Sequence, residues 1–303
     1  MNKLKSLRDM DLNEVTILYR NLFENMFQAD IFEKISLSYQ CKYNTFLEFK
    51  NKGYNSPTAM GRDKIAYGRN IIYGWFLEEL LAEFLQNNQF IKNIAFFGKD
   101  KNHDFVYFHN EKNIKIAGTK SADPDILITL KSDVKFLVEI KTAAKNIFTV
   151  KDSNIQNLIN STAQNDLSCI VLMLDLINGR YEIQDLNFFF NKKPFSNTNL
   201  EGQLCYDFPT PSTPLSGLLT LDFETFLDLS ILEHLQVKKF RLLKIATEKN
   251  NKQMIKIIKD KIALDKLTEK KEIDIKNYDE KIQEIIAKNI MVLKSWEEIE
   301  LLT

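Results

Sequence analysis

Two hydrophobic periods occur along this chain, one helical and one strand-like, and the change between them indicates how the chain is organised. Residues 1–60 carry apolar side chains at helical spacing, and a further helix is predicted from about Asp63 to Gln86. In the second half of that helix an apolar stripe recurs every three or four residues, formed by Tyr73, Phe76, Leu77, Leu80, Leu81 and Phe84. The stripe predicts a helix that packs one face against a core.

Short runs of β-branched and aromatic residues follow this helix and predict strands. The first two runs are FIKNIAFFG (90–98) and HDFVYFH (103–109). DILITL (125–130) and VKFLVEIK (134–141) flank the short segment 131–133, which predicts an antiparallel hairpin with a tight turn. On one face of the second strand of this hairpin, four apolar side chains are expected to point into a core: Val134, Phe136, Val138 and Ile140.

A helix and two more strands complete the predicted sheet. Asp152 or Ser153 can cap a helix whose apolar positions begin at Ile155. LSCIVLMLDL (167–176) is an uninterrupted apolar run, typical of a strand buried on both faces. Asn178-Gly179 predicts a tight turn into another strand. The order of these elements predicts an α/β fold in which helices flank a mixed β-sheet.

The last third of the chain has a different pattern. Residues 191–219 contain four of the six prolines and are predicted to be irregular, as a boundary or a long loop. From about Asp222 the pattern is helical again and rich in Lys. These helices are either solvated and amphipathic, or a subdomain that dimerises or contacts DNA. The expected division is a helical region at 1–60, a core at 61–190, and a loop with a helical subdomain at 191–303.

Composition excludes several classes of protein. Basic and acidic residues number 41 each, so net charge decides nothing about nucleic-acid binding. Nine Gly and six Pro are too few for a turn-rich all-β protein. The scattered cysteines predict neither disulfides nor structural zinc, and Cys41, Cys169 and Cys205 are expected to be buried. The sequence shows no membrane span and no secretory signal, so a cytoplasmic location is expected.

Residues suited to chemistry gather on the predicted hairpin. Asp125 opens its first strand, and Glu139-Ile140-Lys141 closes its second. Residues two apart on a strand share a face, so Glu139 and Lys141 project together. The start of one strand lies opposite the end of the other, which brings Asp125 beside them. Two carboxylates and one ammonium are therefore expected at the same end of a rigid hairpin.

This combination suits chemistry that depends on Mg²⁺. The ion binds oxygen ligands and keeps several waters, so Asp125, Glu139 and the Ile140 backbone carbonyl can hold it beside a phosphate. Phosphodiester hydrolysis needs a nucleophilic water and neutralisation of the phosphate charge, and such an ion supplies both. Lys141 can orient the water or help to deprotonate it, and can stabilise the developing negative charge.

The motif formed by Pro124-Asp125 and Glu139-Ile140-Lys141 resembles the signature of the PD-(D/E)xK nuclease superfamily, which includes most type II restriction endonucleases. The order of predicted elements over residues 62–176 is similar to the restriction-endonuclease-like core of that family. The resemblance therefore implies that 61–190 is a PD-(D/E)xK nuclease core. The resemblance implies an additional metal ligand on the preceding helix, for which Glu78 is the candidate, while Glu79 is expected to point to solvent. It also implies a polar residue on the helix after the hairpin, for which Gln156 is the candidate.

Several other polar residues have two interpretations each. Arg62, Lys64 and Arg69, together with Lys145 after the hairpin, can lie along a DNA backbone or can belong to a solvated surface. His103 and His109 have no cysteine nearby and are interpreted as ordinary core or surface residues.

The resemblance implies a Mg²⁺-dependent type II restriction endonuclease. It would cut double-stranded DNA at a specific site and leave 5′-phosphate and 3′-hydroxyl ends. A homodimer on a palindromic site and a cognate DNA methyltransferase as genetic partner are also implied. Two alternatives stay open. One is a nuclease of the same fold that acts on DNA structure or without a fixed site, and the other is a non-catalytic DNA-binding or scaffold protein.

Overall fold

The structure of the protein is a computed structural model. It describes residues 7–23, 26, 29–52, 64–98, 101–103, 108–109, 114–115, 123–143, 147–165, 167–190, 192–197, 202–223, 242–243, 246–247, 249, 251–271, 299 and 301.

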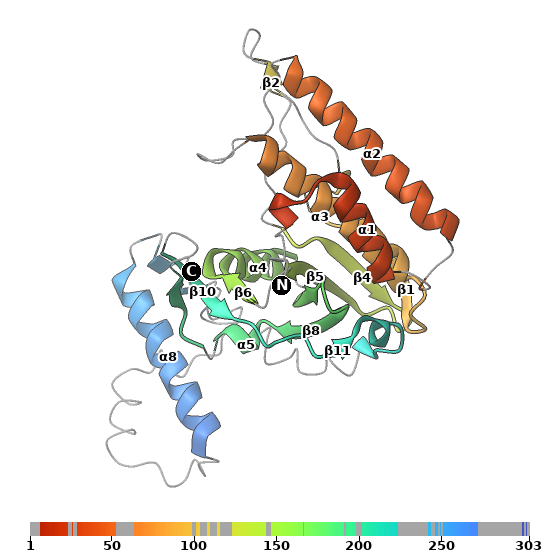
Figure 1. Ribbon diagram of the computed structural model, residues 1–303. Coiled ribbons are helices and arrows are strands. Elements are labelled where there is room, and N and C mark those ends of the chain that lie inside the picture. Colours follow the sequence, from red (N-terminus) through yellow and green to blue (C-terminus); the bar gives the residue numbers. More distant parts are fainter. Residues whose placement is uncertain are drawn as a thin grey trace, which may run out of the picture.

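A six-stranded mixed sheet forms the centre of the molecule, with the strand order β1-β4-β5-β7-β8-β11 (Figure 1). Strands β5 and β7 run parallel, and the other neighbours in this sheet run antiparallel. The strands are β1 (Ile91–Phe96), β4 (Ile126–Leu130), β5 (Lys135–Ala143), β7 (Ser168–Asp175), β8 (Arg180–Asp185) and β11 (Thr213–Pro214). The predicted α/β fold, a mixed sheet flanked by helices, is confirmed.

The hairpin formed by β4 and β5 has the predicted register. Ile126 pairs with Val138, so the first residues of β4 lie opposite the later part of β5. Phe136, Val138 and Ile140 are buried in one core, as expected. The prediction for Val134 was wrong: its side chain is 37% exposed, because this residue still belongs to the turn and β5 begins one residue later.

Helices from the N-terminal part cover one face of the sheet (Figure 1). They are η1 (Leu7–Asp9), α1 (Leu12–Phe23), α2 (Ala29–Asn51) and α3 (Lys64–Leu85). The apolar stripe of α3 is buried along its whole length. Aromatic rings fill this layer, with Tyr19 and Tyr39 packing against Phe76 at centroid distances of 5.2 and 5.1 Å. The first face is therefore closed by an aromatic core centred on α3.

The opposite face has a second core. Helix α4 (Asp152–Asn165), helix α5 (Asn187–Phe190) and a three-stranded sheet pack there, and that sheet has the order β6 (Thr149–Lys151), β10 (Gln203–Asp207), β9 (Phe195–Asn197). Strand β7 contributes Ile170, Leu172 and Leu174 to the first core, and Cys169, Val171 and Met173 to the second. All of β7 is buried, which confirms the prediction of a strand enclosed on both faces.

Two further predictions were wrong, one about a segment and one about a cysteine. The range 191–219 was predicted to be irregular, but its described part contains β9, β10, β11 and the short helix η3 (Leu215–Leu219). Of the strand predicted at 103–109, Phe108–His109 forms β2, which pairs with β3 (Ile114–Lys115), His103 lies outside that strand, and residues 104–107 lie outside the described part. Cys41 is exposed, whereas Cys169 and Cys205 are buried as expected.

The C-terminal part is described mainly by α8 (Lys252–Lys271). This helix has its own small cluster of buried apolar residues, which includes Met254, Ile258 and Ile299. In the described ranges no helix has the length and the apolar character needed to cross a membrane.

Candidate active site

The hairpin brings Asp125, Glu139 and Lys141 together at one end. The backbone N–H of Asp125 donates to the carbonyl of Val138 at 3.1 Å, which extends the β4/β5 ladder to the strand end. Glu139 and Lys141 project to the same face as the buried Leu137, towards the second core. Lys141 Nζ donates to Glu139 Oε1. The geometry expected from the sequence, in which three charged groups meet at the strand ends, is thus present.

The charges at this end of the hairpin are crowded. Glu139 is only 6% exposed, and Asp125 and Lys141 are partly buried. Burial, reinforced by the negative charges of Glu139 and Glu78, raises the pKa of Asp125 well above its usual range, although Lys141 opposes this. Burial on its own would lower the pKa of Lys141, but Glu139 and Asp125 outweigh it and the pKa is raised. Lys141 is therefore a firmly charged ammonium among more carboxylates than it can neutralise.

The backbone of Ile140 faces Asp125. Its N–H donates to Asp125 Oδ2 at 2.6 Å. In an antiparallel strand the N–H and C=O of one residue point to the same side, so the Ile140 carbonyl also faces the β4 side, at the point where β4 has ended. The carbonyl therefore points to the side on which the Asp125 carboxylate lies.

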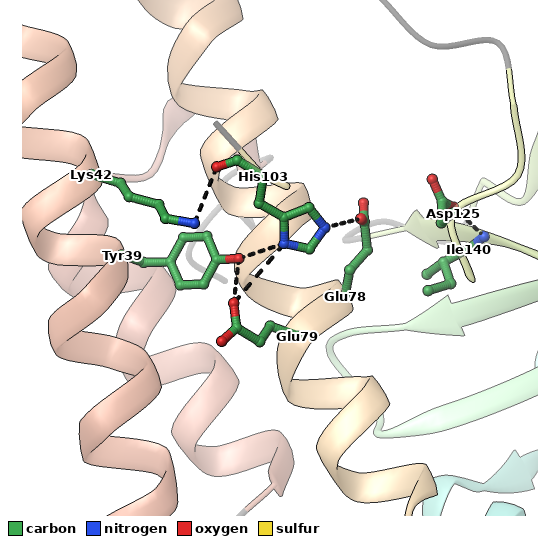
Figure 2. A network of polar contacts seen from close by, with 7 residues as sticks. All are labelled: Tyr39, Lys42, Glu78, Glu79, His103, Asp125 and Ile140. Carbon is green, nitrogen blue, oxygen red and sulfur yellow. Dashed lines mark hydrogen bonds and ion pairs between the residues drawn. The ribbon is translucent and has the colours of Figure 1, made fainter. Parts of the chain in front are cut away.

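Glu78 reaches this site from the other face of the sheet. It lies on α3, which covers the first core, and in Figure 2 its side chain extends between His103 and Asp125. Its charge acts on both Asp125 and Lys141. Its Oε2 lies 3.2 Å from His103 Nε2, and its side chain is 16% exposed. Helix α3 therefore delivers a third carboxylate to the strand ends.

The prediction that Glu79 points to solvent was wrong. Its Oε2 accepts a hydrogen bond from the Tyr39 hydroxyl at 2.7 Å, because α2 packs beside α3 at this position (Figure 2). Burial would raise the pKa of Glu79, but the hydrogen bonds with His103 and Tyr39 outweigh it and lower that pKa. Glu79 is thus a second anion beside His103.

Of the residues predicted to contact DNA, the two whose side chains are described, Arg69 and Gln156, lie on different helices. Gln156 is exposed on α4, over the second core, and its side-chain amide is 3.5 Å from Asp152 Oδ1. Arg69 lies on α3, over the first core, where its charge opposes the rise that burial causes in the Tyr73 pKa. Lys64 is the first residue of α3, and nothing is described of its side chain. Arg62 and Lys145 lie outside the described residues. The structure therefore does not bring Arg69 and Gln156 onto one surface.

The donor atoms at the hairpin end fit a hard cation. Carboxylate and carbonyl oxygens are the ligands that Mg²⁺ prefers, and the ion commonly uses one or two carboxylates together with substrate phosphate oxygens. The excess negative charge, seen in the raised pKa of Asp125, is what such a cation would offset. Among the described residues no three His, Cys, Asp or Glu side chains stand ready as a complete metal cluster. The donors therefore fit an ion that also takes ligands from a phosphate.

No sequence motif marks His103 or Tyr39 as functional. His103 is only 4% exposed and has a left-handed backbone with φ 51°, which is uncommon for a residue other than glycine. Tyr39 comes from a helix 64 residues earlier in the chain. The only signal in the sequence was a histidine next to an aromatic run, and that signal does not identify its partners.

Comparisons with known proteins add little beyond this geometry. No protein-family model matches the chain, and no curated protein sequence matches it. Among solved structures, part of the chain is similar to Hjc, a Holliday junction resolvase from the archaeal hyperthermophile Archaeoglobus fulgidus. The two sequences are 11% identical, the match covers 44% of this chain and 87% of that chain, and the TM-score is 0.27. At these values the fold assignment rests on the strand order and registers described above.

Proposed function

We propose that this protein is a divalent-metal-dependent DNA endonuclease of the PD-(D/E)xK type. The observation that carries the proposal is the convergence of Asp125, Glu139 and Lys141 at one end of the β4/β5 hairpin. Two carboxylates and an ammonium on adjoining rigid strands provide fixed positions for a cation and for a phosphate. The helix-borne Glu78 is a third carboxylate, near enough for its charge to act on Asp125 and Lys141.

Each residue has a separate part in the proposed hydrolysis. Asp125, Glu139 and the Ile140 carbonyl would hold Mg²⁺, with Glu78 as an additional ligand. When bound, the ion would lower the pKa of an attacking water and neutralise charge on the scissile phosphate. Lys141 has a raised pKa and is a cation at neutral pH, so its contribution is to stabilise the negative charge that builds on the phosphate. A protonated Lys141 cannot accept a proton from the attacking water, so it does not act as the base.

We further propose a specific substrate: double-stranded DNA that is cleaved at a fixed site, as by a type II restriction endonuclease. A homodimer on a palindromic sequence, products with 5′-phosphate and 3′-hydroxyl ends, and a cognate methyltransferase belong to this proposal. Arg62, Lys64, Arg69, Lys145 and Gln156 are the proposed DNA contacts.

The test is digestion of mixed plasmid and phage DNA by the full chain, with Mg²⁺ and with EDTA. Glu139→Gln and Lys141→Met are the informative variants. We expect each to slow cleavage by roughly 100-fold or more, since the loss of one charged group at a developing charge has that order of effect. Lys135→Met is the matched control, because Lys135 lies on the same strand and the same face but is exposed at the turn end. It should cleave within about twofold of wild type.

The pattern of products separates the finer possibilities. Discrete bands that need Mg²⁺ would support a site-specific enzyme, and ligation of these fragments without added kinase would support 5′-phosphate ends. A smear, or cutting confined to branched DNA, would keep the nuclease proposal and remove the restriction assignment. If neither unmodified nor methylated DNA is cut by the folded protein, the nuclease proposal is refuted and a non-catalytic DNA-binding role takes its place.

A further inference from the structure

A buried polar network next to the candidate site joins three distant parts of the chain (Figure 2). It consists of Tyr39 and Lys42 on α2, Glu78 and Glu79 on α3, and His103 in the segment after β1. Figure 2 shows the His103 ring at the centre, with Tyr39 and Glu79 on one side and Glu78 on the other. Glu78 is also the residue whose charge acts on Asp125.

The direction of each hydrogen bond follows from counting protons. The Tyr39 hydroxyl has one proton, which it donates to Glu79 Oε2 at 2.7 Å. The contact of 2.8 Å between that hydroxyl and His103 Nδ1 is then donated by the ring nitrogen, so the ring donates from both nitrogens and is the protonated imidazolium. The other ring nitrogen, Nε2, faces Glu78 Oε2 at 3.2 Å and donates to it. The ring therefore holds Glu78 with one nitrogen and is itself held by Tyr39 with the other.

The surroundings of His103 fix its ring and its backbone. The ring stacks on Trp75 at 5.6 Å and 14°, and it contacts Phe96 at a centroid distance of 4.2 Å. Lys42 Nζ donates to the His103 carbonyl at 3.1 Å, which ties the left-handed backbone to α2. A side chain enclosed in this way has few alternative positions. Such anchoring would not be needed for a histidine that only filled space.

We propose that His103 is a positioning residue for the active site: its Nε2–H fixes the Glu78 carboxylate at the strand ends, and Tyr39 and Glu79 hold the ring in that orientation. This inference rests on the proposed function, because it assumes that Glu78 serves a bound cation. Without the His103 contact, the negative charge of Asp125 would repel Glu78 from the place where that cation is expected. Helix α2 thereby takes part in the organisation of the site.

Two substitutions at His103 separate a positioning role from a purely structural one. The amide nitrogen of Gln can take the place of Nε2, so His103→Gln keeps the donor to Glu78 and loses the link to Tyr39. The amide nitrogen of Asn can take the place of Nδ1, so His103→Asn keeps the link to Tyr39 and loses the donor to Glu78. Asn also tolerates the left-handed backbone better than Gln does. If His103 has only a structural role, His103→Asn should be the less damaging variant. If it positions Glu78, His103→Gln should keep metal binding better than His103→Asn.

The experiment measures Mn²⁺ binding to the full chain by the loss of the EPR signal of the free ion, together with the thermal midpoint of each variant. Removal of an outer contact to a metal ligand typically weakens metal affinity 10- to 100-fold. We expect His103→Asn to weaken Mn²⁺ binding about tenfold, close to the effect of Glu78→Gln, and His103→Gln to weaken it less than about threefold. The Mg²⁺ concentration for half-maximal cleavage should rise in the same order.

Tyr39→Phe has a matched control in Tyr19→Phe. Both tyrosines are buried against Phe76 and donate a hydrogen bond to α3, but the Tyr19 hydroxyl bonds the Tyr73 carbonyl at 3.0 Å, outside the network. Only Tyr39→Phe should weaken Mn²⁺ binding, by a few fold, whereas both variants should lower the thermal midpoint.

The inference is overturned if the wild type binds no Mn²⁺, if Glu78→Gln binds it as well as the wild type, or if His103→Asn binds it more tightly than His103→Gln. Its failure is distinguishable from failure of the proposed function. Mn²⁺ affinities in the expected order without any DNA cleavage would uphold the positioning role and refute the nuclease. Cleavage by the wild type, with equal Mn²⁺ affinities in all variants, would uphold the nuclease and refute the positioning role.

Discussion

Two glycines on α3 offer a test of how tightly α2 is seated on this helix. A Cβ atom added at Gly68 would lie 2.5 Å from Phe46 Cε2, and the Phe46 ring is fully buried between the two helices. A Cβ added at Gly74 would meet only Glu78 Oε1, at an ordinary contact distance of 3.7 Å. The same substitution in the same helix therefore enters a closed space at Gly68 and an open one at Gly74.

The expected magnitudes follow from two opposing effects. Replacing Gly by Ala inside a helix stabilises it by about 0.8–1.0 kcal/mol. Forcing extra atoms into a packed core costs about 1–3 kcal/mol, and the enclosed Phe46 ring has no flexible end that could yield cheaply. Gly74→Ala should therefore raise the free energy of unfolding by up to about 1 kcal/mol, whereas Gly68→Ala should leave it unchanged or lower it by up to about 2 kcal/mol.

The assay is urea unfolding of both variants, followed by far-UV circular dichroism. Phe46→Leu provides the internal check, because a smaller side chain should remove most of the clash at Gly68. The double variant should therefore be more stable than the sum of the two single effects, with a coupling of about 0.5–3 kcal/mol. Equal stability of Gly68→Ala and Gly74→Ala would refute the described packing of α2 on α3.

Three further predictions concern single residues. Asp125→Asn should raise the metal-free free energy of unfolding at pH 7 by about 0.5–2 kcal/mol while activity is lost. Since burial and the charges of Glu139 and Glu78 raise the Asp125 pKa, this gain should grow as pH rises above 3.8 and vanish in acid; a flat profile would contradict it. Burial would lower the His103 pKa, but the hydrogen bonds with Glu78 and Glu79 outweigh it and raise that pKa. The thermal midpoint of the wild type should therefore exceed that of His103→Asn by the full amount below pH 6.5, and this difference should decline as pH rises above 6.5. Gly179 has a left-handed φ of 60°, so Gly179→Ala should cost about 1–2 kcal/mol in urea unfolding and Gly179→Asn clearly less.

Local patterns were sufficient to predict the hairpin and its charged end. Alternation of apolar residues set the faces of β5, and the short turn at 131–133 set its register against β4. Because register follows from those two features alone, the neighbourhood of Asp125 and Glu139 could be derived without knowledge of the rest of the chain. The buried strand β7 was equally visible, since eight enclosed residues in a row need an uninterrupted apolar run.

The network around Glu78 could not be predicted in the same way. A helical wheel places Glu79 away from the apolar stripe of its own helix, but it cannot show that α2 packs there and brings Tyr39. The left-handed backbone of His103 depends on Lys42 and on the surrounding rings, which belong to other elements. The short strands at 195–214 were missed because two to five residues with prolines carry no clear period. Each of these errors concerns a partner that is distant in sequence.

The aromatic residues of the N-terminal helices help to stabilise the site. A carboxyl group with a raised pKa and a histidine with a left-handed backbone both cost folding free energy, and both lie at the same end of the sheet. They lie beside an aromatic core in which Tyr19, Tyr39 and Phe76 are fully buried, and burial of this kind offsets such costs. Helices α1 and α2 supply two of those three rings. The N-terminal helices are therefore part of the structure that keeps the carboxylates together, and loss of their packing is expected to disperse the site before it unfolds the sheet.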